Sequence, residues 1–171
     1  MKISSAVENL ARGLAIAGGL ALVAITGIIV VSITGRALIH QGLGPVPGDF
    51  ELVEVLTAFA VFAFLPWCQL RRGHATVDVF TKALPERANA AIDLVSELLM
   101  TLVVMLIAWR LCYGMWDKMR FGETSFILQF PLWWGFAASL VAAVAGVVVS
   151  LFVFSQRLRS FFIADHTGEA S

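Results

Sequence analysis

The 171-residue chain is 59% hydrophobic and only 14% charged, and its formal net charge is zero. Soluble domains carry about 25% charged residues, whereas the apolar residues here gather in long runs without an amphipathic period. The composition therefore predicts a helical membrane protein. The balanced charge, with a sequence pI near 6.8, gives no indication of a nucleic-acid partner.

The first apolar run covers residues 13–35, which include no charged residue, and Arg36 ends it. A signal peptide has an apolar region of only about 7–15 residues followed by a small-residue cleavage site. This run is too long and no convincing site follows it, so we predict a retained first span. Residues 36–50 are rich in glycine and proline and are expected to form a loop.

The second span, residues 50–71, begins with Glu51 and Glu54 and continues through sixteen uncharged residues to Leu70. From Asp49 to Arg72 a helix would be about 36 Å long, enough to cross a hydrocarbon core of about 30 Å. We expect Asp49 to cap its N-terminus, because aspartate is a preferred N-cap residue. After it, residues 77–84 are either a short interfacial helix or an ordinary loop.

The third span, residues 90–113, is the least apolar, because only residues 98–109 are free of charge. A crossing needs about 20 residues, so Glu97, Arg110 or both must lie in or near the membrane. Both side chains could instead extend to the headgroups. The helix could continue beyond residue 113, with Gly122 as its stop.

The fourth span, residues 131–154, has tryptophans at its start and arginines after its end, as expected at the two membrane interfaces. Within it a small residue recurs at every fourth position, which favours close packing against another helix; these residues are Ala138, Ala142, Gly146 and Ser150. Residues 155–171 are predicted to be a cytoplasmic tail, disordered over its last eight residues.

Basic residues predict the orientation of the four spans. With the N-terminus inside, eight lysines and arginines lie on the cytoplasmic side and four lie on or near the outer side. Both termini are therefore predicted to be cytoplasmic. This orientation brings Arg36, Glu51, Glu54 and Arg110 to a similar depth near the outer surface. Because unpaired charge near lipid is costly, Arg36 or Arg110 should pair with Glu54 or with a group on a partner.

Motifs for chemistry are missing from the sequence. The three histidines lie in the predicted loops or tail, whereas a haem protein needs histidines inside facing spans. No Cys-x-x-Cys pair, phosphate loop or metal-ligand spacing occurs. We expect no enzyme, cofactor or metal site. A transporter acting alone would usually show a broken helix or a buried mid-span carboxylate, and neither is evident.

Four features in order resemble the small membrane subunit (DctQ-like) of the tripartite ATP-independent periplasmic, or TRAP, transporters. Arg36 closes the first span, and Glu51 and Glu54 open the second. Arg72-Gly73-His74 is followed by Val77-Asp78, and a segment from Glu123-Thr124-Ser125 leads to Pro131 and Trp133. The resemblance covers roughly residues 10–155. It departs at Ala37, where relatives commonly have an aromatic residue, so no contact is assigned there.

This resemblance implies a four-span subunit of the bacterial inner membrane, in contact with membrane lipid. It would act as a scaffold for a large elevator-type (DctM-like) subunit that carries the substrate and sodium sites. A periplasmic binding protein would deliver the substrate, an organic anion whose identity depends on other chains. The candidate structural or partner-contact residues are the small residues of the fourth span together with Arg36, Glu51, Glu54, Arg72, His74, Asp78, Glu97 and Arg110.

Two other functions stay open on the sequence. One is a stand-alone small proton-coupled exporter, which should form a homodimer. The other is a membrane-anchor subunit of a respiratory enzyme, which should carry a coloured cofactor. Copurification distinguishes them, because a TRAP subunit should bring down a much larger hydrophobic protein without haem or flavin.

Overall fold

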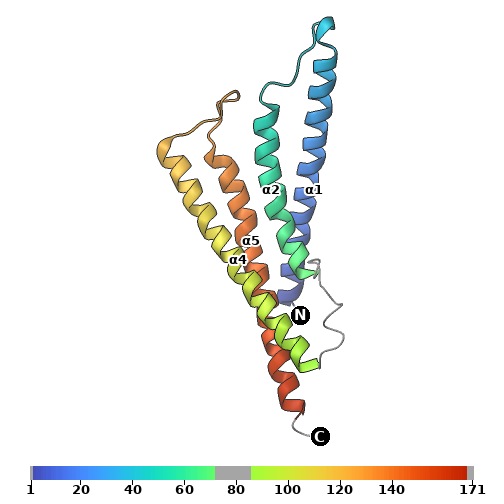
Figure 1. The fold of residues 1–171 in the computed structure, drawn as a ribbon, viewed down its shortest axis with the longest axis vertical. Coiled ribbons are helices and arrows are strands. Elements are labelled where there is room, and N and C mark those ends of the chain that lie inside the picture. The colour runs from blue at the N-terminus through green and yellow to red at the C-terminus, as the bar shows by residue number, and fades with distance from the viewer. Residues whose placement is uncertain (1, 72–85, 169–171) are drawn as a thin grey trace.

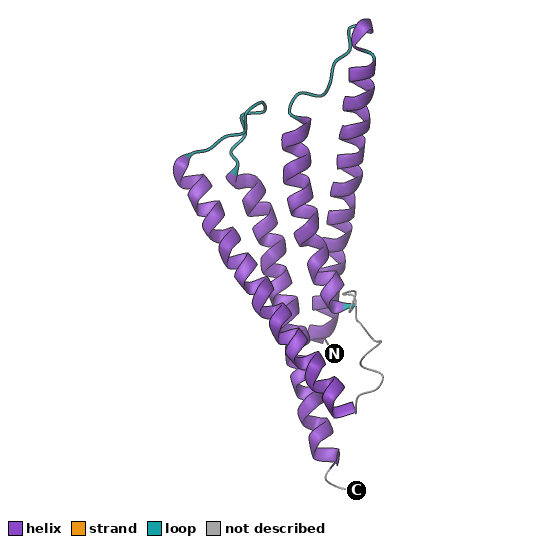
Figure 2. Cartoon of the chain, in the orientation of Figure 1, coloured by secondary structure: helices purple, strands orange, loops and turns teal. Residues whose placement is uncertain are grey.

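The computed structural model describes residues 2–71 and 86–168 of the chain. They form four long helices, α1 (Lys2–Ala37), α2 (Asp49–Leu70), α4 (Glu86–Phe121) and α5 (Trp133–Gly168), with a single 3₁₀ turn, η1 (Ile39–Gln41), between the first two (Figures 1 and 2). Each long helix contains a stretch apolar and long enough to cross a membrane. The predicted all-α fold with four transmembrane helices is thus confirmed.

The helices stand in a row, in the order α1, α2, α5, α4 (Figure 1). Each contacts its neighbour in this row, and α1 also touches α5 near the chain's N-terminus. Helix α5 is the most enclosed. Within its apolar stretch 33% of the residues are buried, against 17% in the apolar stretch of each other long helix. The row leaves two broad apolar faces uncovered, as expected of a subunit that meets lipid or a partner.

Small residues set the distances between neighbouring helices. A Cβ at Gly18 of α1 would lie 3.2 Å from Cβ of Ala63 in α2. A Cβ at Gly135 of α5 would lie 3.0 Å from a methyl group of Val55, again in α2. Without a hydrophobic force between helices in lipid, such close backbone approach supplies the van der Waals contact that holds them together.

The two ends of the row differ. We call the end that carries the chain termini the terminal end. There Val7 and Ala11 of α1 form a hydrophobic cluster with Val149 of α5, and Trp67 of α2 packs against it. Toward the opposite end, here the loop end, the pair α1–α2 diverges from the pair α4–α5 (Figure 1). The loop end carries residues 38–48 and 122–132, which connect the helices of each pair.

Helices α1, α4 and α5 extend beyond the predicted spans. α1 already begins at Lys2, and α4 continues to Phe121, where Gly122 with φ of 60° ends it as predicted. α5 continues to Gly168, so the predicted disorder is wrong for residues 164–168. The charged residues beyond each span did not stop these helices, since Lys, Arg and Glu are good helix formers.

Asp49 does not cap α2. The N-cap position is held by Gly48, with φ of 73°, and no side chain caps the helix. One Asp49 carboxylate oxygen accepts a hydrogen bond from the hydroxyl of Ser32 in α1, and the other accepts the Phe50 N–H. Asp49 therefore binds a residue of another helix and does not cap its own. The sequence around Asp49 alone does not predict such a contact. The possible interfacial helix at residues 77–84 lies outside the described residues.

Candidate functional site

Glu51 is the centre of the loop end. It lies in the first turn of α2, and its carboxylate accepts three hydrogen bonds from the loop between α4 and α5. The donors are the Ser125 hydroxyl at 2.8 Å, the Ile127 N–H at 2.7 Å and the Leu128 N–H at 3.0 Å. Hydrogen bonds to an ionised acceptor are among the stronger ones in proteins. Glu51 thus fixes a loop more than 70 residues away to the start of α2.

The loop it holds is a compact hairpin-like turn. Thr124 and Pro131 form an isolated antiparallel bridge, with the Ser125 N–H donating to the Phe130 carbonyl at 2.9 Å. Gln129 has a positive φ of 56°, which is uncommon for a residue with a side chain. The backbone amides of the turn therefore point toward Glu51, whose carboxylate satisfies two of them.

Two glycines, Gly35 and Gly48, allow close packing of the loops at this end. A Cβ at Gly48 would lie 2.5 Å from Cγ of Leu128, so the leucine packs directly on the backbone before α2. A Cβ at Gly35 would lie 2.1 Å from the carbonyl oxygen of Gly44, so the end of α1 touches its own following loop. Neither approach leaves room for a side chain.

Arg36 pairs within the subunit, but with an unexpected partner. Its guanidinium lies 3.9 Å from the Asp49 carboxylate, which also binds Ser32. Among the described residues neither Arg36 nor Arg110 pairs with Glu54. The intrasubunit form of the predicted charge pair is therefore wrong, and pairing with a partner subunit stays a prediction. The partner of Arg36 is Asp49, which the sequence predicts only as the cap of the second span.

Polar contacts also join the helices at the terminal end. Arg71, just after α2, binds Glu8 of α1 at 3.0 Å and stacks over the Trp67 ring at 4.7 Å. Arg157 of α5 binds Asp93 of α4 at 3.1 Å. These are exposed ion pairs, which fix helix register more than they add stability.

Glu97 is the charged residue that lies furthest inside a predicted span boundary. The side chain of Gln69, which is buried in α2, donates a hydrogen bond to its carboxylate. Glu97 therefore joins α4 to α2, two helices that are not adjacent in the row. Arg110 is exposed on α4 and pairs with none of the described residues.

The stripe of small residues on α5 faces the inside of the subunit over most of its length. Ala142 and Ser150 are buried, and a Cβ at Gly146 would lie 3.7 Å from Val104 of α4 and 3.9 Å from Pro66 of α2. Ala138 is exposed. Three of the four small residues thus occupy the crowded middle of the helix row, and the fourth lies on its surface.

Three predicted contact residues, Arg72, His74 and Asp78, lie outside the described residues. Within the described ranges, no three histidine, cysteine or acidic side chains are grouped closely enough to hold a metal ion. The loop end is therefore a structural junction in which carboxylates order loops and helix ends. Ser125 belongs to the family-like segment that begins at Glu123, but nothing in the sequence predicts that Ser125 and Leu128 donate hydrogen bonds to Glu51.

A family model describing the DctQ component of tripartite ATP-independent periplasmic transporters matches residues 25–161. The match covers most of the chain and includes the end of α1, all of α2 and α4, the Glu51 junction and the stripe on α5. No curated protein matched the chain. Transporters of this type combine a small and a large membrane component with a periplasmic binding protein. With its four apolar helices, this chain belongs to the DctQ family and is a small inner-membrane component of a TRAP transporter.

Proposed function

We propose that this chain is the fixed frame of a sodium-driven, binding-protein-dependent uptake system for organic anions, and that it transports nothing alone. The large membrane subunit would carry substrate and sodium and move against this frame. The observation that carries the proposal is that polar contacts tie each helix of the row to a neighbour near its ends.

At the loop end, Asp49 joins α2 to α1, and Glu51 joins α2 to the loop between α4 and α5. At the terminal end, Arg71 joins α2 to α1, and Arg157 joins α5 to α4. A row of helices in lipid would otherwise tilt or slide at modest cost, because lipid contacts resemble apolar helix contacts. Polar contacts near both ends of the helices resist such motion, as a static subunit of an elevator-type transporter would require.

The apolar faces of the row supply anchoring area. Leu20 and Val23 of α1 are 66% and 70% exposed, and Trp109 and Trp116 of α4 are 55% and 61% exposed. Exposed apolar area on both outer helices is suited to lipid on one side and to a partner subunit on another. We place both termini in the cytoplasm, on the eight-to-four distribution of basic residues. Arg72, His74 and Asp78 remain proposed partner contacts on the same side.

Reconstitution tests the proposal. Liposomes would contain this chain and the large membrane subunit, with the binding protein and labelled anion outside and an inward sodium gradient. Omitting this chain should abolish or strongly reduce uptake, and this chain alone should give none. Full uptake without it, or sodium-driven uptake by it alone, would refute the frame assignment.

Copurification provides a simpler comparison with the two alternative functions. The tagged chain should bring down one much larger hydrophobic protein. A homodimer without that protein would favour an exporter, and a coloured complex would favour a respiratory anchor.

A further inference from the structure

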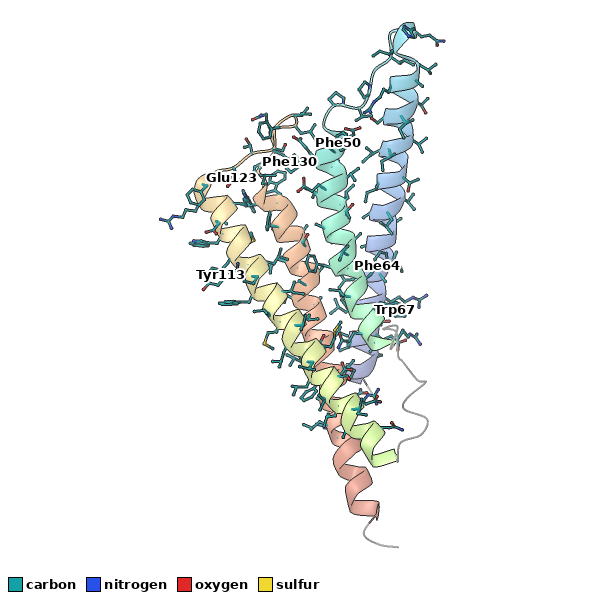
Figure 3. The ribbon with its side chains drawn as sticks, viewed as in Figure 1. Phe50, Phe64, Trp67, Tyr113, Glu123 and Phe130 are labelled. Carbon is teal, nitrogen blue, oxygen red and sulfur yellow. The ribbon has the colours of Figure 1, made fainter. Side chains whose placement is uncertain are left out.

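A cavity of about 430 Å³ opens between the diverging helix pairs at the loop end. One wall is α2, a second is α5, and the loop that Glu51 holds forms the wall nearest the loop end (Figure 3 labels Phe130 and Glu123 beside it). Most of the lining is apolar, including Val55, Leu111 and Phe136. The size lies within the range of about 300–1,000 Å³ that accommodates small molecules, and it far exceeds the need of a bare ion.

Three carboxylates line this cavity, and two of them are bound by other described residues. Glu51 is fully engaged by the loop, and Glu123 binds Lys118. Glu54, one turn further along α2 than Glu51, is exposed and has no hydrogen bond or ion pair with any described residue. It lies about 7.5 Å along the helix from Asp49. A carboxylate inside a transmembrane segment normally pairs with a cation or faces water.

Ser139 supplies a second, independent polar group on the α5 wall. The residue is 1% exposed, and its hydroxyl oxygen has no hydrogen-bond partner among the described residues. A helical serine commonly bonds the carbonyl four residues earlier, and here that bond is not formed. Buried hydroxyls are rarely left unsatisfied, so this one indicates a donor or acceptor that the subunit alone does not provide.

We propose that this cavity receives an arginine side chain from a transmembrane helix of the large membrane subunit. The inference rests on the proposed assembly with that subunit. The guanidinium would donate to the Glu54 carboxylate and to the Ser139 hydroxyl, and the methylene stem would lie along the apolar walls. Arginine suits the site because it carries five donors and can donate to a carboxylate and a hydroxyl together. Its high pKa also keeps it charged in a membrane.

The surface beside the cavity favours a helix over a lipid as the source of the cation. Glu54, Ala58 and Val61 are all exposed on α2 and follow the spacing i, i+4, i+7, which defines one helix face. The small Ala58 next to the carboxylate permits close approach of another backbone. A helix lying on this face would bring its side chains to the mouth of the cavity.

Charge reversal with a matched control tests the proposal. Glu54→Gln, Glu54→Arg and Ser139→Ala would each be coexpressed with the tagged large subunit. Asp117→Asn is the control, because Asp117 is an exposed acid near the loop end of α4 that pairs with no described residue and does not line the cavity. The measurements are the amount of small subunit that copurifies and the melting temperature of the complex and of the isolated subunit.

We expect Glu54→Gln to reduce copurification several-fold, Glu54→Arg to reduce it further, and Ser139→Ala to have a smaller effect. The isolated Glu54 variants should melt at or above the wild-type temperature, because Glu54 has no partner to lose among the described residues. Asp117→Asn should match the wild type in both measurements. Among large-subunit variants with one membrane arginine changed to glutamate, one should restore binding of Glu54→Arg. The Ala58→Cys variant should form a cross-link to the large subunit near the position of that arginine.

Complexes of Glu54→Gln and Glu54→Arg that are as abundant and stable as the wild type would overturn the proposal. So would native mass spectrometry showing a bound amine-headgroup lipid that Glu54→Gln alone releases, since the cation would then come from the membrane. Failure of the wild-type chain to copurify with the large subunit would instead refute the proposed function itself.

Discussion

Replacing Gly146 by leucine tests whether α5 is packed between α2 and α4. A Cβ at this position would lie 3.7 Å from Val104 Cγ1 and 3.9 Å from Pro66 Cγ, which are ordinary contact distances. Alanine therefore fits. It should raise the free energy of unfolding by about 0.5–1 kcal/mol, because glycine destabilises a helix interior by that amount relative to alanine. Leucine carries three further carbon atoms toward buried neighbours on two helices. Such overpacking typically costs about 1–3 kcal/mol.

The same stripe provides the matched control. Ala138 lies two turns before Gly146 on α5 but is exposed, so Ala138→Leu adds the three carbon atoms by which leucine exceeds alanine without meeting another helix of the subunit. Its effect on the isolated chain should stay within about 0.5 kcal/mol, as for ordinary surface substitutions. The comparison therefore separates loss of packing from a general effect of leucine on membrane insertion.

The assay is thermal unfolding of the purified subunit in detergent, followed by fluorescence-detected size exclusion after heating. The expected order of melting temperatures is Gly146→Ala at or above wild type, Ala138→Leu close to wild type, and Gly146→Leu several degrees lower. If Gly146→Leu melts with the wild type, or no lower than Ala138→Leu, the stripe does not pack between α2 and α4. The position of α5 at the centre of the row would then be wrong.

Three further predictions concern orientation and the loop end. In a background lacking both native cysteines, an impermeant thiol reagent added to intact cells should label Gly44→Cys but not Thr167→Cys, and labelling of the latter would overturn the cytoplasmic termini. Glu51→Ala removes the acceptor of three hydrogen bonds, so limited proteolysis should cut the loop between α4 and α5 faster, and an unchanged rate would contradict its anchoring role. Gly35→Ala should lower the melting temperature, because its Cβ would meet a backbone oxygen at 2.1 Å, whereas Gly27→Ala, with open space around it, should not.

The spans could be predicted from sequence because their signal is local. Uncharged runs, interfacial tryptophans and flanking arginines each depend on residues near one another in the chain. The helices continue beyond the predicted spans, and the sequence predicted disorder only for the last eight residues of the chain. Residues 2–12 and 155–168 are helical, so the predicted disorder is wrong for residues 164–168. Val7 and Ala11 at the start of α1 pack on Val149, a contact between residues far apart in sequence.

The loop-end contacts could not be predicted, because they join residues far apart in sequence. Asp49 looked like a local cap, and the structure uses it to bind Ser32 and Arg36 of another helix. Glu51 looked like one of several acids near a surface, and it is the acceptor for a loop some 75 residues away. Ser139 gave no signal at all, because a single serine in an apolar span is common.

Glu51 and Glu54 show how one helix would serve two requirements of the proposed frame. They are three residues apart and have the same chemistry, yet Glu51 accepts three hydrogen bonds from its own chain and Glu54 pairs with none of the described residues. The Glu51 carboxylate orders the loop that forms one wall of the cavity, and the Glu54 carboxylate lies on the wall beside it. A frame must hold its own shape before a partner arrives, so its internal contacts have to be complete without that partner. It must also present at least one unsatisfied group, because burying a new ion pair between complementary surfaces fixes the register of a partner helix more strictly than apolar contact does.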